Sequence, residues 1–263
     1  MIRWCSYCQA FCDEQPPYHD LALSHVICPA CEVRLERDEQ LIAETEAPRL
    51  LMKQIFRAAA RGDAAAIDPL LAGATALGLT TASLLLGVLQ PLLHRTGRRW
   101  QAGAIAVADE HQITAWCERA FARLPVAPPP PRAPLDLLLL VAPGNTHTLG
   151  PRFAATALRE RGLRVHAIVP ELPIDDVVDE VVRLRPAIVG MSCATTAVVP
   201  DAVAQLTTLR ARLGAAAPRV LLGGMAARQA TPPPAVDGVP WIATVGQAEA
   251  AIRAGAGPAP DAS

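Results

Sequence analysis

Four cysteines near the N-terminus form two pairs whose spacing is typical of a metal site. Cys5 and Cys8 make the first Cys-x-x-Cys pair, and Cys28 and Cys31 make the second. Each tight pair can direct two thiolates toward one tetrahedral ion, and the nineteen residues between the pairs leave room for a hairpin. We therefore predict a zinc ribbon over residues 1–37. Metal binding would supply the folding free energy that so short a segment lacks.

Other groups in this segment leave alternatives open. Cys12 and His25 lie between the two pairs and could replace a ligand, although neither belongs to a pair. A redox dithiol pair or buried thiols are the alternatives to a metal site. The segment carries mixed charge and no basic stripe, so we expect a structural or protein-contact role and not direct DNA binding.

A second candidate site lies in a loop that follows an apolar run at residues 135–141. The loop contains Asn145, His147 and Gly150, and a helical pattern follows it. Ligands bind beyond the carboxyl ends of such strands in α/β sheets, and neutral imidazole is the commonest protein ligand for metals. A lone loop histidine is more often simply exposed to solvent, so the surrounding pattern decides the interpretation.

The spacing Asn145-x-His147-x-x-Gly150 resembles the Asp-x-His-x-x-Gly signature of cobalamin-binding domains. These domains occur in methionine synthase, the corrinoid proteins and the CarH-type photoreceptors. The resemblance implies that His147 displaces the cofactor's own base and binds cobalt from below. It also implies that Gly150 lets the displaced nucleotide tail approach the helix. Asn145 departs from the family's Asp and carries no charge, so we expect a weaker cobalt–histidine bond.

Two further segments are similar to the same family. Ser192 and Thr196 resemble the Ser-x-x-x-Thr stretch after the third strand, whose hydroxyls bind the buried nucleotide. Gly223 and Gly224 resemble the glycine pair after the fourth strand, where the tail passes against bare backbone.

Upstream, Trp100, nine intervening residues, and then Glu110-His111 resemble the Trp-x9-Glu-His motif of CarH-type photoreceptors. In that family a helical bundle caps the upper cobalt face, and the tryptophan packs over the adenosyl group. After light breaks the cobalt–carbon bond, the cap histidine can take the vacated position. The resemblance therefore implies adenosylcobalamin as the cofactor. The alternative is that Trp100 anchors the end of a bundle and that Glu110-His111 is a solvated helical turn.

The helical part of the chain precedes the His147 loop. Residues 38–47 form a charged connector, and residues 48–124 contain four helical patterns. Breaks fall at Gly62-Asp63 and at Gly78, and Thr80-Thr81 caps the third helix, which we expect to end near Arg95. The fourth helix is expected to run from Gln101 or Gly103 to about Arg123. Short breaks favour an antiparallel four-helix bundle. The Pro-rich linker at residues 125–134 must end it.

Residues 135–255 alternate between apolar strands and helices, which predicts a Rossmann-like, doubly wound parallel sheet. The strands are expected at residues 135–141, 164–169, 187–192, 219–223 and 241–245, and the helices begin near Gly150, Ile174, Val198 and Gln247. Residues 256–263 are expected to form a flexible tail. The predicted fold class is thus multi-domain α and α/β.

Composition restricts the class of protein. About half of the residues (51%) are apolar and the net charge is −1, so no long-range field favours nucleic acid or anionic lipid. We find no apolar run of membrane-spanning length and no signal-peptide pattern, and therefore expect a cytoplasmic protein. Cys193 is interpreted as a packed side chain, His166 as a core or surface side chain, and the acidic residues that follow Ile174 as helix-start residues. No catalytic residue is assigned.

Together these observations predict a cobalamin-binding sensor that is not an enzyme. We expect its output to be contact with a protein partner, or self-association, through the cap or the zinc ribbon. A corrinoid protein that carries methyl groups between methyltransferases is the alternative, because a Pro-rich hinge would let its cap swing away. A zinc-dependent transcription factor with an empty cobalamin fold is the third possibility.

Overall fold

A computed structural model describes residues 1–5, 8, 10–35, 46–126, 128, 130, 134–229 and 238–255. The chain divides into two compact units, Met1–Val126 and Ala127–Ser263, and each is described by itself. The predicted connector and linker lie largely outside the described residues, and the predicted tail lies wholly outside them.

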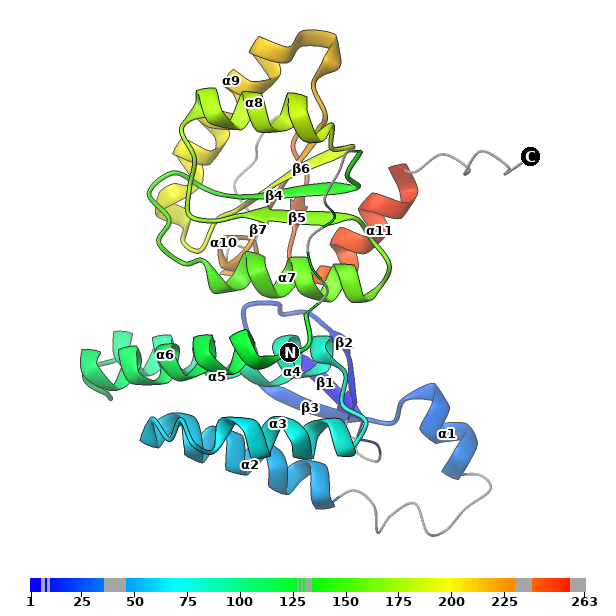
Figure 1. Ribbon diagram of the computed structural model, residues 1–263, viewed down its shortest axis with the longest axis vertical. Coiled ribbons are helices and arrows are strands. Elements are labelled where there is room, and N and C mark those ends of the chain that lie inside the picture. Colours follow the sequence, from blue (N-terminus) through cyan, green and yellow to red (C-terminus); the bar gives the residue numbers. More distant parts are fainter. Residues whose placement is uncertain are drawn as a thin grey trace. The chain divides into compact units, whose positions relative to one another are not determined.

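The N-terminal module is a small sheet of three strands followed by a helix (Figure 1). The strands are β1 (Ile2–Cys5), β2 (Phe11–Glu14) and β3 (Leu23–Val26), and the helix is α1 (Pro29–Leu35). β1 is the central strand and pairs antiparallel with β2 and parallel with β3. The Ile2 and Trp4 side chains of this central strand are buried.

The helical part of the first unit contains the four predicted helices. They are α2 (Glu46–Arg61), α3 (Ile67–Ala76), a long third helix and α6 (Val107–Arg123). The third helix consists of α4 (Thr81–Leu84), a π-helical turn (Leu85–Leu89) and α5 (Gln90–Gln101). Its start is set by Thr80, whose hydroxyl oxygen accepts a hydrogen bond from Ser83 N at 3.1 Å.

The third helix ends later than the expected position near Arg95, and α6 begins at Val107 and not at Gln101 or Gly103. Gly103 has a left-handed φ of +67°, and its N–H donates to the carbonyl of Trp100 at 2.9 Å. The N–H of Ala104 donates to the carbonyl of Arg99 at 2.8 Å. This pair of bonds is a Schellman motif, so the glycine, and not the basic residues before it, ends the helix.

The second unit contains a five-stranded sheet in which every neighbouring pair is parallel. The strands are β4 (Leu137–Val141), β5 (Val165–Ile168), β6 (Ile188–Ser192), β7 (Arg219–Gly223) and β8 (Trp241–Ile242), in the order β5-β4-β6-β7-β8. β5 lies on one side of β4, and β6 lies on its other side. The chain therefore reverses its direction of winding between β4 and β6.

Helices cover both faces of this sheet (Figure 1). α7 (Leu149–Glu160) and α11 (Val245–Gly255) pack one face through Leu158 and Ile252. The other face is packed by α8 (Ile174–Leu184), α9 (Val199–Leu213) and α10 (Met225–Gln229). Short 3-10 turns lie at Thr196–Val198 and Gly214–Ala216. The predicted multi-domain α and α/β fold, with a Rossmann-like sheet, is confirmed.

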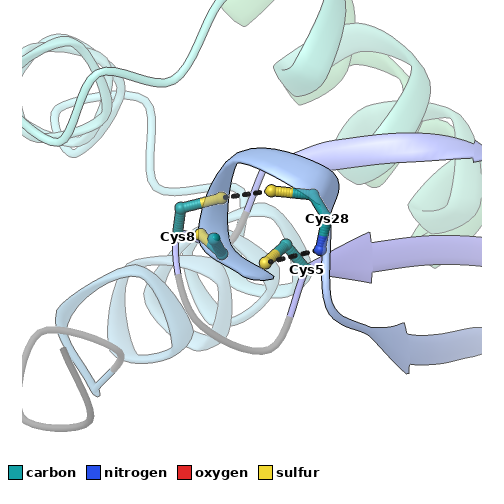
Figure 2. Close-up of side chains that lie close together, drawn as sticks. Cys5, Cys8 and Cys28 are labelled. Atoms are coloured by element: carbon teal, nitrogen blue, oxygen red, sulfur yellow. Dashed lines mark hydrogen bonds between the residues drawn. The ribbon is translucent and has the colours of Figure 1, made fainter. Parts of the chain in front are cut away.

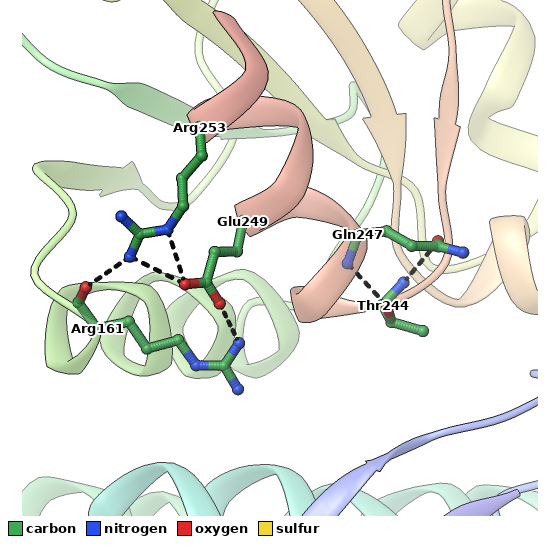
Figure 3. Close-up of polar contacts among 5 residues, drawn as sticks. All are labelled: Arg161, Thr244, Gln247, Glu249 and Arg253. Atoms are coloured by element: carbon green, nitrogen blue, oxygen red, sulfur yellow. Dashed lines mark hydrogen bonds and ion pairs between the residues drawn. The ribbon is translucent and has the colours of Figure 1, made fainter. Parts of the chain in front are cut away.

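Side-chain contacts hold α11 in place at both of its ends (Figure 3). Thr244 Oγ1 accepts from Gln247 N at 3.0 Å, and Gln247 Oε1 accepts from Thr244 N at 3.3 Å, which forms a reciprocal cap. Farther along the helix, the Glu249 carboxylate forms ion pairs with Arg161 at 2.6 Å and with Arg253 at 2.9 Å. Arg161 follows α7, so this ion-pair network joins the two helices of one face. Among the described residues, no helix is both long and apolar enough to cross a membrane.

Candidate functional site

The strand order reverses its direction of winding beside the loop that carries His147. β4 leads into α7 on one face of the sheet, whereas β6 leads into α9 on the other face. The loops after two such strands separate, and ligands of α/β sheets bind in the resulting crevice. Asn145 and His147 follow β4, and Ser192 ends β6. The structure therefore places three of the predicted site residues at one strand-end crevice.

Asn145 connects the two sides of this crevice. Its side chain is 5% exposed, and Nδ2 donates to the Ser192 carbonyl oxygen at 2.9 Å. The amide orientation follows, because only the nitrogen can donate to a carbonyl. Oδ1 then faces His147, where it accepts from the backbone N–H at 3.1 Å and lies 3.3 Å from Nδ1.

His147 is oriented by this contact. Since Oδ1 of Asn145 is an acceptor, the pairing requires the Nδ1-protonated tautomer of the imidazole. Nε2 then carries the lone pair, and the residue is exposed. A histidine whose far nitrogen donates to an oxygen while Nε2 is free has the arrangement typical of a metal ligand.

The turn before His147 has a clear local cause. The N–H of Asn145 donates to the Ala142 carbonyl at 3.0 Å, which closes a turn around Pro143 and Gly144. Gly144 has a φ of +73°. Proline followed by a glycine with positive φ is the signature of a type II turn. The turn bends the chain sharply after β4, so Asn145 lies against the end of β6.

The three predicted site glycines differ in their surroundings. A Cβ at Gly150 would meet no atom within 4 Å, so the backbone there is open to close approach. A Cβ at Gly224, by contrast, would lie 2.4 Å from the Cys193 carbonyl oxygen, and φ there is +96°. At Gly223 the corresponding distance to the Ile242 carbonyl oxygen is 3.1 Å. Backbone packing alone therefore explains Gly224 and largely explains Gly223.

The segment after β6 contains the two predicted hydroxyl residues. Ser192 is the last residue of the strand, and Thr196 is exposed at the start of a 3-10 turn. Between them, Cys193 is fully buried, and burial raises the pKa of its thiol to about 12. Such a thiol stays protonated and unreactive at neutral pH, which agrees with its interpretation as a packed side chain.

The predicted cap residues belong to the first unit and lie at one end of the α5–α6 hairpin. Trp100 is in the last turn of α5 and is 46% exposed, which is unusual for so large an apolar side chain. Glu110 and His111 are in the first turns of α6. Their side chains pair at 2.7 Å, and Thr114 Oγ1 donates to Glu110 Oε1 at 2.7 Å. Glu110 is thus held in place, while His111 remains exposed.

The structure brings the four predicted zinc ligands together. The sulfur atoms of Cys5, Cys8, Cys28 and Cys31 all lie within 4.8 Å of one another. Three of them are labelled in Figure 2, with Cys8 Sγ 3.7 Å from Cys28 Sγ and the Cys28 N–H donating to Cys5 Sγ at 3.4 Å. Four thiolates around one point form a donor set that fits tetrahedral zinc.

Burial distinguishes these thiols from ordinary surface cysteines. It raises the pKa of Cys31 and of Cys8. Burial, followed by the nearby cysteines, raises the pKa of Cys12 to about 11. Cys12 contacts the Ala10 carbonyl at 3.6 Å and lies outside the four-sulfur group. His25 is on β3 and is also outside that group among the described residues.

Comparison with known proteins identifies the two larger domains. A family model described as "B12 binding domain" matches residues 51–124, and a second model with the same description matches residues 135–253. The chain belongs to the B12-binding family. B12 is cobalamin, so family membership agrees with the cofactor that the His147 loop implied.

One relative and one solved structure show how far this B12-binding chain resembles proteins that are already known. It is 36% identical over 141 residues to the HTH-type transcriptional repressor CarH of Myxococcus xanthus, over 54% of this chain and 46% of the relative. The chain thus spans about half the length of that relative. The monomethylamine corrinoid protein of Methanosarcina barkeri matches with a TM-score of 0.62, covering 79% of this chain and 100% of its own. At 15% identity, this second likeness shows the fold alone.

One hydrogen bond that holds the turn before His147 could not be predicted from the sequence. The Gly144 N–H donates to the carboxylate of Glu171, which follows β5. The N–H of Gly144, the third residue of the type II turn, takes no part in the bond that closes the turn. The Glu171 carboxylate is its acceptor. Nothing in the spacing of 27 residues predicts this contact, because it depends on β4 and β5 being neighbours in the sheet.

Proposed function

We propose that this protein is a cobalamin-binding regulator that responds to light through adenosylcobalamin. The observation that carries the proposal is the Asn145 bridge, whose contact with Nδ1 leaves the lone pair of the exposed His147 on Nε2, after the first strand of a B12-binding domain. The 36% identity to a transcriptional repressor supports regulation as the output. Bound adenosylcobalamin would supply the light-sensitive cobalt–carbon bond.

In this proposal the residues after β4 and β6 hold the lower face of the cofactor. His147 binds cobalt through Nε2, and Asn145 keeps the imidazole in the required tautomer. The open backbone at Gly150 admits the nucleotide tail. Ser192 and Thr196 bind that tail with their hydroxyls, while Gly223 and Gly224 keep the adjoining backbone compact enough to border it.

The helical cap protects the upper face in the same proposal. Trp100 offers an exposed indole face on which an adenosyl group can stack. Glu110 positions His111 through their 2.7 Å contact, so that the histidine is ready when the upper ligand is lost. Cys5, Cys8, Cys28 and Cys31 would hold a structural zinc ion in this proposal.

The signal would leave the protein through a change of contacts and not through catalysis. We propose a cytoplasmic regulator whose cap or zinc module contacts a protein partner or a second copy of the chain, without direct DNA binding. The rival function is a corrinoid methyl carrier, whose cap would protect methylcobalamin and open toward a partner enzyme.

One experiment separates the two functions. The purified full chain is reconstituted in the dark with adenosylcobalamin or with methylcobalamin, and visible spectra are recorded before and after illumination. A light regulator should retain adenosylcobalamin preferentially and change its spectrum irreversibly in light. Equal retention of both cofactors, together with methyl transfer to an added methyltransferase, would favour the carrier.

A further inference from the structure

A buried tryptophan of the N-terminal module contacts the helical cap. Trp4 is 1% exposed, and its indole Nε1 donates to the carbonyl oxygen of Gly87 at 3.2 Å. A Cβ at Gly87 would lie 2.1 Å from Cζ2 of the indole ring. Only glycine leaves room for the ring against the third helix at this point. The N-terminal module therefore packs against the third helix through its side chains, in addition to its connection along the chain.

The sequence of the third helix explains why Gly87 accepts this bond. In an α-helix its carbonyl would pair with the N–H four residues later, but that residue is Pro91, which has no N–H. The proline ring also displaces the carbonyl of the residue four positions earlier. The helix forms the π-helical turn Leu85–Leu89 just before this proline. The indole N–H of Trp4 donates to the Gly87 carbonyl in place of the N–H that Pro91 lacks.

The position of the indole depends on the cysteine cluster. Trp4 and Cys5 are consecutive residues of β1, and consecutive side chains of a strand point to opposite faces. One therefore reaches the helix while the other reaches the metal site. Phe11 of β2 packs edge-on against the indole, with ring centroids 6.3 Å apart, and Gln90 of α5 contacts Glu14 of β2 at 3.4 Å.

We propose that the metal held by the four cysteines stabilises the π-helical turn of the cap through Trp4. The inference deepens the proposed function and rests on its metal site. A three-stranded module of this size depends on metal for its folding. When the metal leaves, β1 loses its order, and the indole no longer fills the space over Gly87 or donates to its carbonyl. Metal occupancy thereby sets the stability of the helix that carries Trp100 in its last turn.

The test measures hydrogen exchange in the full-length chain without any cobalamin. Peptides from the third helix are followed by mass spectrometry in zinc-loaded protein, after zinc removal by a chelator, and after zinc is restored. Loss of one buried hydrogen bond and its packing should speed exchange around Gly87 by about tenfold or more. Peptides from α8 and α9 should not respond, and restored zinc should reverse the change.

Variants show whether Trp4 transmits the effect. Trp4→Phe removes the indole N–H, and Gly87→Ala places a methyl group where the ring lies, so both should speed exchange in zinc-loaded protein and shrink the response to chelation. Gly97→Ala is the matched control, because it lies in the same helix and its Cβ would meet no atom within 4 Å. It should keep the full response. Trp4→Phe remains informative if Gly87→Ala does not fold.

The outcomes separate this inference from the metal assignment. A chain that binds no zinc overturns the metal site and, with it, the coupling. A chain that binds one zinc, but whose third helix exchanges at the same rate with and without it, overturns only the coupling. Cobalamin binding enters neither measurement, so failure of the light-sensing proposal would leave both conclusions standing.

Discussion

The amide nitrogen of Asn145 donates to the carbonyl oxygen of Ser192 at 2.9 Å and so joins the ends of the two central strands of the sheet. The family pattern has an aspartate at this position, which would place an acceptor oxygen against another acceptor. The amide instead satisfies Ser192 with its nitrogen and His147 with its oxygen. In this chain the imidazole therefore has no negative charge beside it, but the Asn145 side chain forms a hydrogen bond that links the ends of β4 and β6.

Asn145→Asp should consequently destabilise the region around His147, although it introduces the residue of the family pattern. Loss of the bond to Ser192 and the resulting contact between two oxygens should lower the free energy of unfolding by about 1–2 kcal/mol. Denaturant unfolding of the cobalamin-free chain measures this change. The exposed neighbour Thr146→Ala should leave stability unchanged. A more stable Asn145→Asp protein with a stronger histidine-ligated spectrum would contradict the account.

His147→Ala should abolish the histidine-ligated visible spectrum and weaken cobalamin retention about tenfold or more, as loss of metal-site groups commonly does. The reason is that Asn145 occupies Nδ1 of His147, so that Nε2 is the nitrogen with a lone pair for cobalt. Thr146→Ala serves again as the control within the same loop. An unchanged spectrum in His147→Ala would mean that another group, or the cofactor's own base, binds the lower cobalt face.

Trp100→Ala should erase a preference for adenosylcobalamin over methylcobalamin. Stacking of a base on an aromatic ring contributes about 1–3 kcal/mol, which corresponds to a roughly five- to hundredfold change in relative affinity. Titration with both cofactors in the dark measures the ratio. Leu50→Ala, at another exposed apolar residue of the bundle, should preserve it. Equal affinities in the wild-type chain would favour the methyl carrier.

Elemental analysis should find one zinc per chain, and Cys28→Ser should lose it. Cys12→Ser should keep it, because Cys12 lies outside the four-sulfur group. Metal affinity should fall as pH falls, because protons compete for the thiolates and burial has raised the pKa of Cys31. A folded chain without metal at neutral pH would rule out the zinc assignment.

The ion-pair network of Glu249 predicts a pH-dependent part of stability. Burial raises the pKa of this carboxyl, but hydrogen bonds from Arg161 and Arg253 outweigh burial and lower it below the ordinary value of 4.5. A lowered folded-state pKa stabilises the protein above the unfolded-state value, and this stability is lost as pH falls through the folded-state value. The contribution is about 1 kcal/mol for a partly exposed network.

Glu249→Gln should remove that contribution at pH 7 and flatten the loss of stability below about pH 4.5. Thermal unfolding across this pH range provides the measurement, with the exposed Asp179→Asn as the control. Identical pH profiles for Glu249→Gln and the wild-type chain would show that the network in Figure 3 does not stabilise the unit.

Local patterns were enough to predict the elements and the nature of the candidate sites. Unbroken apolar runs indicated buried parallel strands, and Gly62 and Gly78 marked helix ends. Two Cys-x-x-Cys pairs predicted a four-cysteine cluster, because each pair already has the geometry of half a tetrahedral site. The family resemblance of the His147 loop then indicated the cofactor class. All of these signals lie within a few residues of one another, where spacing alone fixes geometry.

Contacts between distant segments were decided only by the tertiary structure. The direction of the Asn145 amide depends on Ser192 lying opposite it. Gly224 looked like a ligand contact, yet it is required by the carbonyl of Cys193. The fit of Trp4 over Gly87 joins residues 83 positions apart. In each case the partner is brought close by the pairing of strands or the packing of helices, and a linear spacing contains no record of that proximity.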